Sequence, residues 1–303
     1  MDFESIIGRV KPNKMKTVAV ASAEDDLVLK AVAAAHKMGI AAPILCGDAA
    51  VIKDIANKEG LDISAFEIVH TEPSEAARTA VALVREGKAH MLMKGLLQTS
   101  DLLKAVLDKE NGLRGNGILS HISILHSPIL NRQLLLTDAA IVMYPDLKTK
   151  VKLIENSVYA AAGLGIGCPK VAVLAAVELI NPDMPATLDA ACLTSMNRRG
   201  QIKDCIVDGP LAMDLALSGE AVRHKGIDSQ VAGKADILLF HNIEAANSAL
   251  KVFTHAGNCL FGGVVIGASA PIILTSRSDS DQSKLYSIAC AASICGKEGG
   301  ENK

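Results

Sequence analysis

The residues with the clearest capacity for chemistry lie near the end of the chain, at residues 271–281, which read PIILTSRSDSD. Residues 272–274 form a short apolar run with two β-branched isoleucines, which predicts a buried strand. Ser276 and Arg277 follow on the way to a helix that begins near Ser280. A helix start offers unpaired N–H groups, a serine adds a hydroxyl donor, and an arginine can hold two oxygens of a phosphate. Open α/β sheets bind ligands at this end of their strands. The segment therefore predicts an anion site.

The same residues also have a plainer interpretation. Ser276 and Ser280 can simply cap a helix, and Arg277 can be a solvated surface charge, which is the more common state of an isolated Ser-Arg pair. Evidence from other parts of the chain has to decide between the two.

A second strand end carries a lysine and a glycine. Residues 91–93 predict a strand, after which Lys94 can face a phosphate and Gly95 permits a close approach of the backbone. Thr99 then lies where a helix to residue 107 is expected to begin. The alternative is that Lys94 merely ends a strand before a turn.

Two further strand ends are predicted in the second half of the chain. Asp208 begins a predicted turn at residues 208–210, after a predicted strand at residues 202–207. Asn247 lies on a helix that follows the strand at residues 237–240. Asp208 has an equally good interpretation as an ordinary turn residue.

Strands and helices alternate along most of the chain, which predicts α/β domains with mostly parallel sheets covered on both faces. A new series of elements starts near Thr137, so we predict two α/β/α domains with the active cleft between them. Their predicted limits are residues 1–137 with 273–303, and residues 138–272. The helix at residues 280–293 is expected to pack on the first domain.

Composition excludes several classes of function. The 303 residues are 50% hydrophobic and 21% charged, with a net charge of −2 and no Trp, so neither a basic surface nor a set of stacking aromatics indicates nucleic acid as a partner. The seven cysteines form no C-x-x-C pair and have no histidine at metal-ligand spacing, so no metal site is predicted.

Location is predicted from two further stretches. The first 14 residues lack the apolar core of a secretory signal, which favours a reducing cytoplasm. Residues 256–274 are uncharged and long enough to span a bilayer, yet they contain several glycines and a proline. Two buried strands joined by a loop explain them better, and no membrane partner is expected.

Three motifs occur in the order found in one family of enzymes: DGPLxxD from residue 208, an asparagine-bearing helix start from residue 242, and TSRxxS from residue 275. The chain resembles the phosphate acetyl/butyryltransferase family over roughly residues 91–292. The stretches SRSDSDQSKLYSIACAA and HNIEAANSALK are more similar to its butyryl branch. The resemblance implies two α/β domains with an isocitrate/isopropylmalate dehydrogenase-like architecture, no metal or other cofactor, and a homodimer or larger homo-oligomer.

The resemblance also implies roles for individual residues. Ser276 and Arg277 match the serine and arginine that face the thiol and phosphoryl groups. The acetyl branch has an aspartate where this chain has Ser283 and an arginine where it has Lys104. Asp281, or else Asp279, is the substitute expected for the carboxylate, and Lys104 or Arg132 for the second cation. The remaining residues expected to bind substrate are Lys94, Gly95, Thr99, Asp208, Asn247, Ser278 and Ser280.

The implied reaction is reversible transfer of a short acyl group between CoA and inorganic phosphate, so the expected partners are acyl-CoA, phosphate and acyl phosphate. A ternary complex permits direct transfer, and the sequence contains no Ser-His-Asp or Cys-His pattern that indicates a covalent intermediate. Three alternatives stay open. One is a phosphate acetyltransferase, another is a metal-dependent decarboxylating dehydrogenase of the same fold, and the third is a non-catalytic sensor of CoA or acyl phosphate.

Overall fold

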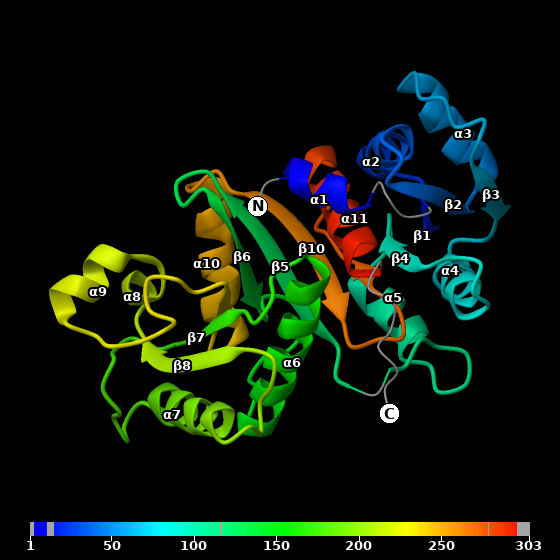
Figure 1. Ribbon diagram of the computed structural model, residues 1–303. Coiled ribbons are helices and arrows are strands. Elements are labelled where there is room, and N and C mark those ends of the chain that lie inside the picture. The colour runs from blue at the N-terminus through cyan, green and yellow to red at the C-terminus, as the bar shows by residue number, and fades with distance from the viewer. Residues whose placement is uncertain (1–2, 11–14, 116, 278, 296–303) are drawn as a thin grey trace. The chain divides into compact units, whose positions relative to one another are not determined.

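The computed structural model describes residues 3–10, 15–115, 117–277 and 279–295 of the chain (Figure 1). The chain divides into a first unit, Met1–Gly117 with Phe261–Lys303, and a second unit, Ile118–Leu260. The division predicted from the sequence placed the two crossings after residues 137 and 272. Residues 118–137 therefore belong to the second unit of the structure, and residues 261–272 to the first.

The sheet of the first unit has the strand order β3-β2-β1-β4-β11-β10. Neighbouring strands are parallel, except that β10 and β11 are antiparallel. The strands are β1 (Lys16–Ala21), β2 (Ala41–Gly47), β3 (Glu67–His70), β4 (Met91–Lys94), β10 (Leu260–Ile266) and β11 (Ile272–Ile273). The helices are α1 (Phe3–Val10), α2 (Asp26–Lys37), α3 (Ala49–Lys58), α4 (Ala76–Arg85), α5 (Thr99–Val106) and α11 (Asp281–Cys295).

Helices cover both faces of this sheet, as the sequence predicts. The chain moves outward from β1 to β3 and then returns to β4, so right-handed crossovers place α4 on the face opposite α2 and α3 (Figure 1). Helix α11 packs against α1 and α2, which confirms the expectation that the C-terminal helix packs on the first part of the chain. Because both faces are covered, residues 18–21 of β1 and 91–93 of β4 are buried and continuously apolar.

Local signals explain where the first helix after β1 begins. Ser22 does not cap the helix that follows β1. Asp25 caps α2, with Oδ1 accepting a hydrogen bond from Val28 N at 2.8 Å. Ser22 instead has a φ of 55° and is buried at the end of β1. The chain therefore makes a tight bend at the carboxyl end of β1 before the helix starts.

The sheet of the second unit has the strand order β5-β6-β9-β7-β8. Strands β5 and β6 are antiparallel, and the other neighbours are parallel. The strands are β5 (Ser120–Ser127), β6 (Arg132–Thr137), β7 (Lys170–Leu174), β8 (Ile206–Leu211) and β9 (Ile237–Leu239). The helices are α6 (Leu147–Gly163), α7 (Pro185–Arg198), α8 (Met213–Leu217), α9 (Gly219–Lys225) and α10 (Ile243–His255).

One sequence expectation in this unit is wrong. The predicted strand at residues 202–207 and turn at 208–210 are replaced by β8, which runs straight through Asp208, Gly209 and Pro210. Pairing with β7 explains the difference, because Asp208 lies opposite Ala172 and the register shifts before the next pair. Proline is tolerated at such an irregularity because it has no N–H to donate to the ladder. Turn propensity is thus overridden by sheet pairing.

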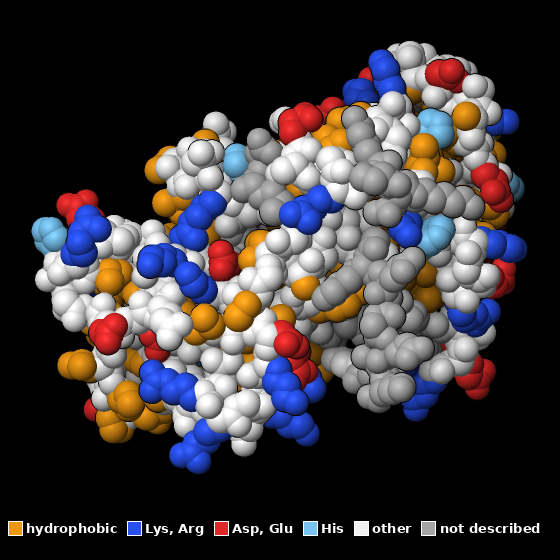
Figure 2. Space-filling model, viewed as in Figure 1, with side chains coloured by type: hydrophobic (Ala, Val, Ile, Leu, Met, Phe, Trp, Pro, Cys, Tyr) orange, Lys and Arg blue, Asp and Glu red, His pale blue; other side chains and the backbone are white. Residues whose placement is uncertain are grey.

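The uncharged stretch at residues 256–274 supplies β10 and β11, as the sequence predicts. Across the residues that the structure describes, no helix has the length and the apolar character needed to cross a bilayer. Figure 2 shows lysine and arginine side chains interspersed with acidic ones on the face it displays, in agreement with the balanced net charge of −2.

Candidate functional site

Three neighbouring parallel strands of the first unit end at the same edge of the sheet. Strand β4 pairs in parallel with β1 on one side and β11 on the other, so the segments after Ala21, Lys94 and Ile273 all leave from this edge. Two of the predicted substrate-binding segments, those of Lys94 and Ser276, are thereby brought together. We call this region the β1–β4–β11 edge.

The backbones at this edge lie very close to each other. Gly95 N donates to Ala21 O at 2.8 Å, and Leu96 N donates to Ser22 O. A Cβ atom on Gly95 would lie 2.0 Å from Ser22 O, so only glycine fits. The close approach predicted at Gly95 is therefore made to the protein's own backbone.

Two buried lysines lie beside the edge. Lys94 is 7% exposed, and its Nζ donates to the carbonyl oxygens of Gly95 at 3.2 Å and Leu97 at 3.1 Å. Lys284, on the first turn of α11, is 2% exposed, and its Nζ donates to Ser276 O at 3.0 Å and Asp279 O at 2.9 Å. No carboxylate of the described residues lies within ion-pair distance of either ammonium. Carbonyl dipoles alone stabilise these charges only in part.

The pKa values of both lysines report the same environment. Burial lowers the pKa of Lys94, the positive charges of Arg277 and Lys284 lower it further, and Asp25 and Asp279 act in the opposite direction. Burial likewise lowers the pKa of Lys284, while nearby aspartates, Asp279 first, raise it. Three positive side chains therefore influence one another at this edge.

The loop after β11 has an internal frame of hydrogen bonds. Ser276 N donates to Asp279 Oδ2 at 2.7 Å, and Asp279 N donates to Ser276 O at 3.2 Å. Ser280 Oγ accepts from Ser283 N at 3.1 Å, so Ser280 caps α11. Ser276 and Arg277 are exposed to solvent on this loop, and Arg277 has no ion pair within the described residues. Ser278 lies outside the described residues.

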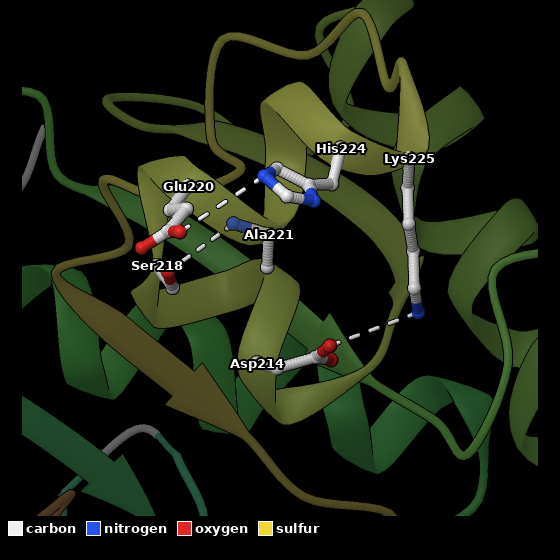
Figure 3. Close-up of a pocket in the computed structure, with 6 residues that line it drawn as sticks. All are labelled: Asp214, Ser218, Glu220, Ala221, His224 and Lys225. Atoms are coloured by element: carbon white, nitrogen blue, oxygen red, sulfur yellow. Dashed lines mark hydrogen bonds and ion pairs between the residues drawn. The ribbon is translucent and has the colours of Figure 1, made fainter.

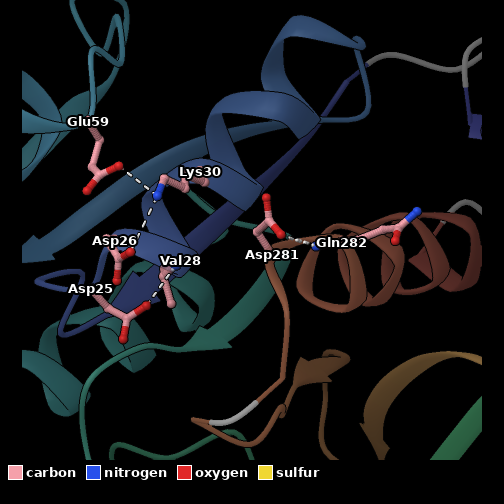
Figure 4. A network of polar contacts seen from close by, with 7 residues as sticks. All are labelled: Asp25, Asp26, Val28, Lys30, Glu59, Asp281 and Gln282. Atoms are coloured by element: carbon pink, nitrogen blue, oxygen red, sulfur yellow. Dashed lines mark hydrogen bonds and ion pairs between the residues drawn. The ribbon is translucent and has the colours of Figure 1, made fainter. Parts of the chain in front are cut away.

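Carboxylates surround the start of α11. Asp281 is exposed, and its Oδ1 accepts from Gln282 N at 2.9 Å. Figure 4 shows it near the start of α2, where Asp26 pairs with Lys30 at 3.4 Å. Of the two carboxylates that the sequence offers for proton transfer, Asp279 is within the loop and hydrogen-bonded to Ser276 N, whereas Asp281 lies on its rim.

The other predicted residues of the first unit lie on α5. Thr99 is its first residue and is half-buried, but it does not cap the helix, which begins after Gln98. Lys104 is exposed in the last turn, and it makes no hydrogen bond or ion pair to any residue in the described ranges. Neither makes a polar bond to the described residues of the loop after β11.

The predicted residues of the second unit all bind that unit's own polypeptide. Arg132 lies at the amino end of β6, where Nη1 donates to Ala235 O at 2.8 Å. Asp208 accepts a hydrogen bond from Ser229 Oγ and another from Gly209 N. Asn247 Nδ2 donates to Ala139 O at 3.0 Å. In this structure each has a packing role.

A surface pocket of about 350 Å³ lies elsewhere in the second unit and contains none of the predicted residues (Figure 3). Polar groups of its lining lie close to one another, since Lys225 Nζ lies 3.7 Å from Asp214 Oδ2 and His224 Nε2 lies 3.9 Å from Glu220 Oε1. It is lined by Asp214, Ser218, Glu220, Ala221, His224 and Lys225. Within residues 3–10, 15–115, 117–277 and 279–295, no group of three or more His, Cys, Asp or Glu side chains is arranged to hold a metal ion.

Comparison with known proteins identifies the family. The profile described as phosphate acetyl/butaryl transferase matches residues 2–79 and 73–292. The phosphate butyryltransferase of Clostridium acetobutylicum is 51% identical over 298 residues, which are 98% of this chain and 99% of that protein. The chain belongs to the phosphate acetyl/butaryl transferase family.

Solved structures agree with this assignment. A branched-chain phosphotransacylase from Enterococcus faecalis V583 is 34% identical, with a TM-score of 0.83 over 93% of this chain and 99% of that one. A 4-hydroxythreonine-4-phosphate dehydrogenase from Klebsiella pneumoniae has a TM-score of 0.57 over 93% of this chain and all of that one, at 13% identity. The second likeness concerns the fold alone, and it agrees with the dehydrogenase-like architecture expected for this transferase family.

The structure adds two residues that the sequence reasoning overlooked. Lys284 is the most buried cation at the β1–β4–β11 edge, and Asp25 is a carboxylate that affects both lysines. A signal for Lys284 exists in the sequence, because it is the only charged residue between residues 282 and 296. A single lysine in a helix that is otherwise uncharged after its first residue, Asp281, indicates a buried charge. Asp25 has no such signal beyond its capping role.

Proposed function

We propose that this chain transfers a short acyl group, with butyryl preferred, between CoA and inorganic phosphate, and that phosphate binds at the β1–β4–β11 edge. The observation that carries the proposal is the pair of buried ammonium groups, Lys94 and Lys284, with no carboxylate at ion-pair distance among the described residues. Membership of the transferase family and 51% identity to a phosphate butyryltransferase support the reaction.

Phosphate binding follows from charge. An anion at the edge gains from the three positive charges of Lys94, Arg277 and Lys284, and its own charge compensates the cost of burying the two ammoniums. The guanidinium of Arg277 is exposed and can hold two phosphate oxygens through parallel hydrogen bonds.

The proposed reaction is a direct displacement. A phosphate oxygen attacks the thioester carbonyl carbon, the carbonyl oxygen becomes a tetrahedral oxyanion, and the C–S bond then breaks to release acyl phosphate and the CoA thiolate. Arg277 orients the dianion, and the Ser276 hydroxyl donates to the oxyanion or the thiolate. In the reverse direction Asp279 or Asp281 accepts the thiol proton.

The test is release of free thiol by the purified full chain from acetyl-, propionyl-, butyryl-, isobutyryl- and isovaleryl-CoA, each with and without phosphate. We expect release that depends on phosphate and a higher kcat/KM for butyryl-CoA than for acetyl-CoA. Equal or better use of acetyl-CoA would assign a phosphate acetyltransferase instead. Thiol release that is independent of phosphate, or absent with every acyl-CoA, would refute acyl transfer to phosphate.

Two further expectations from the sequence stay predictions. One is a cytoplasmic location, and the other is a homodimer or larger homo-oligomer. Neither is needed for the placement of phosphate at the β1–β4–β11 edge.

A further inference from the structure

A charged cluster in the second unit has no part in the reaction as described so far. Lys150 on α6 is 1% exposed, and its Nζ lies 2.5 Å from Asp189 Oδ2 on α7 and 2.9 Å from His241 Nδ1. His241 follows β9. Lys150 is separated from Asp189 by 39 residues and from His241 by 91, so only the fold brings the three together.

The contact to Lys150 determines the protonation of the imidazole. An ammonium group has hydrogens to donate and no lone pair, so His241 Nδ1 must accept the bond and the single ring hydrogen is on Nε2. Burial lowers the pKa of His241, the charge of Lys150 lowers it further, and Asp189 acts in the opposite direction. His241 is therefore a neutral imidazole with an Nε2–H donor.

The donor is accessible. His241 is only partly buried, and its Nε2 has no hydrogen-bond partner in the described part of the chain. The described polar atoms that are buried without a partner do not include this Nε2, so it is open to solvent. Strand β9 lies between β6 and β7, parallel to both, so His241 is at the carboxyl edge of the sheet in its own unit. Open α/β sheets bind ligands at this edge.

The chemistry of the donor indicates the acceptor. A phosphate dianion is bound better by an imidazolium than by a neutral ring, so an arrangement in which a buried lysine keeps the ring neutral does not suit phosphate. A neutral N–H suits a neutral acceptor such as a carbonyl oxygen, which it polarises without giving up its proton. Acyl-CoA carries such oxygens in its thioester and in its amide groups.

We propose that His241 is a further substrate-binding residue whose Nε2–H donates to a carbonyl oxygen of the acyl-CoA, with Lys150 and Asp189 as positioning residues that hold the ring in this state. The identity of the substrate rests on the proposed function. The protonation state does not, because it follows from the contacts of the cluster alone.

The first experiment is NMR of the full chain carrying ¹⁵N-labelled histidine, with the His241 signals assigned by their loss in His241→Phe. We expect the neutral Nε2–H tautomer at neutral pH, a shift of the Nε2 resonance with butyryl-CoA in the absence of phosphate, and no shift with inorganic phosphate alone. Free CoA separates the two sources of the carbonyl: a similar shift with free CoA indicates an amide oxygen, and a shift with butyryl-CoA alone indicates the thioester. An imidazolium at neutral pH, no response to butyryl-CoA, or a response to phosphate alone would overturn the proposal.

The second experiment measures kinetics in matched variants. His241→Phe keeps a ring but loses the donor, so kcat/KM for butyryl-CoA should fall about three- to tenfold, the effect of one neutral hydrogen bond, while KM for phosphate is unchanged. His241→Gln restores an N–H donor and should retain activity within about threefold. His255→Phe, on the exposed end of α10, is the control and should match the parent enzyme. Equal activity of His241→Phe and the parent would contradict the assignment.

The positioning role has its own spectroscopic test. Lys150→Met removes the only described donor to His241 Nδ1, so the Nδ1–H tautomer should appear in the ¹⁵N spectrum. A purely structural lysine would change the melting temperature and leave the tautomer unchanged. If the variant does not fold, the ligand titration of the parent protein still decides. Lack of phosphate-dependent thiol release by the parent refutes the proposed function, whereas an active parent with normal His241→Phe kinetics refutes only this inference.

Discussion

At the scale of single residues, the proposed anion site depends on positive charges that have no carboxylate at ion-pair distance among the described residues. Lys94 and Lys284 are buried against backbone carbonyls, and Arg277 is exposed beside them. The three side chains stabilise a bound anion in different ways. The buried ammoniums contribute charge at low dielectric, whereas the guanidinium contributes directed bonds.

Arg277→Lys tests the directed bonds. The variant keeps the charge but loses the two-pronged geometry, and a charge-assisted hydrogen bond contributes about 1.5–3 kcal/mol. We expect kcat/KM for phosphate to fall about ten- to a hundredfold, with an unchanged melting temperature because the side chain is exposed. Steady-state kinetics at varied phosphate measures this.

Two further variants serve as comparisons for Arg277→Lys. Arg199→Lys changes another exposed arginine, at the end of α7, and should have no effect. Ser276→Ala should lower kcat with little change in KM for phosphate, because it removes a donor near the thioester. Near-normal kcat/KM for phosphate in Arg277→Lys would restore the interpretation of Arg277 as a solvated surface charge.

The effect of Lys284 on the free energy of unfolding depends on pH. Its pKa in the folded protein is lowered below the unfolded value, so between these two pKa values the unfolded chain binds more protons and the free energy of unfolding rises with pH. Below the folded pKa the cost of burying the charge is fully present. We therefore expect the unfolding free energy of the parent minus that of Lys284→Met to increase with pH over the range just below the ordinary lysine pKa of about 10.4.

Urea unfolding of both proteins across this range measures the difference. Saturating phosphate should stabilise the parent most at the lower pH values, where Lys284 is charged, and so reduce the slope. A difference that is independent of pH, or that decreases as pH rises, would show that the buried ammonium is not destabilised in the fold.

At the scale of elements, the proposed site depends on how closely the backbones at the ends of β4 and β1 approach each other. Gly95 has no room for a side chain, because a Cβ atom would lie 2.0 Å from the backbone oxygen of Ser22. The neighbouring lysine enters its buried position directly from this junction. Any widening of the junction moves Lys94 Nζ away from the carbonyls that hold it.

Gly95→Ala should therefore reduce both stability and activity. Forcing a methyl group into a packed region costs about 1–3 kcal/mol, and the clash here is with backbone that cannot rotate away. Differential scanning calorimetry and the thiol-release assay measure the two effects. Gly167→Ala is a matched control, since its Cβ meets nothing within 4 Å. A Gly95→Ala protein with the melting temperature and kcat of the parent would contradict the described junction.

At the scale of the whole molecule, the fold limits the possible functions without choosing among them. The same fold occurs in a 4-hydroxythreonine-4-phosphate dehydrogenase, at a TM-score of 0.57 and 13% identity. Chemistry is assigned by particular side chains and not by architecture. In the proposed site the side chains assigned to phosphate are positive, so we expect the protein itself to supply the charge that a divalent cation supplies in many phosphate sites.

Removal of metal should therefore leave the reaction intact. After exhaustive treatment with a chelator, we expect the rate of phosphate-dependent thiol release to stay within about twofold of the untreated enzyme. Re-addition of Mg²⁺, Mn²⁺ or Zn²⁺ should give no increase. Loss of activity that a divalent cation restores would mean that the cations of the β1–β4–β11 edge do not suffice.

The sequence by itself determined what depends on neighbours along the chain. Alternating apolar and capped segments predicted the βα units, and the position of Ser276 and Arg277 between a strand and a helix followed from about ten residues of sequence. Motif order was enough to indicate the family. The boundaries of the units and the course of β8 through Asp208 were predicted differently, because sheet pairing between distant segments overrides local turn propensity.

Only the tertiary structure decided which strand ends meet and which charges are buried. Strand β4 lies between β1 and β11 in the sheet. In the sequence β1 precedes β4 by 70 or more residues and β11 follows it much later, so no local pattern encodes that order. Lys150 looks like any other helix lysine until packing removes its water, and burial is a property of the assembled layers. The same physics brings His241 to Lys150 across 91 residues, since side chains that far apart in sequence meet only when the sheet and its helices have formed.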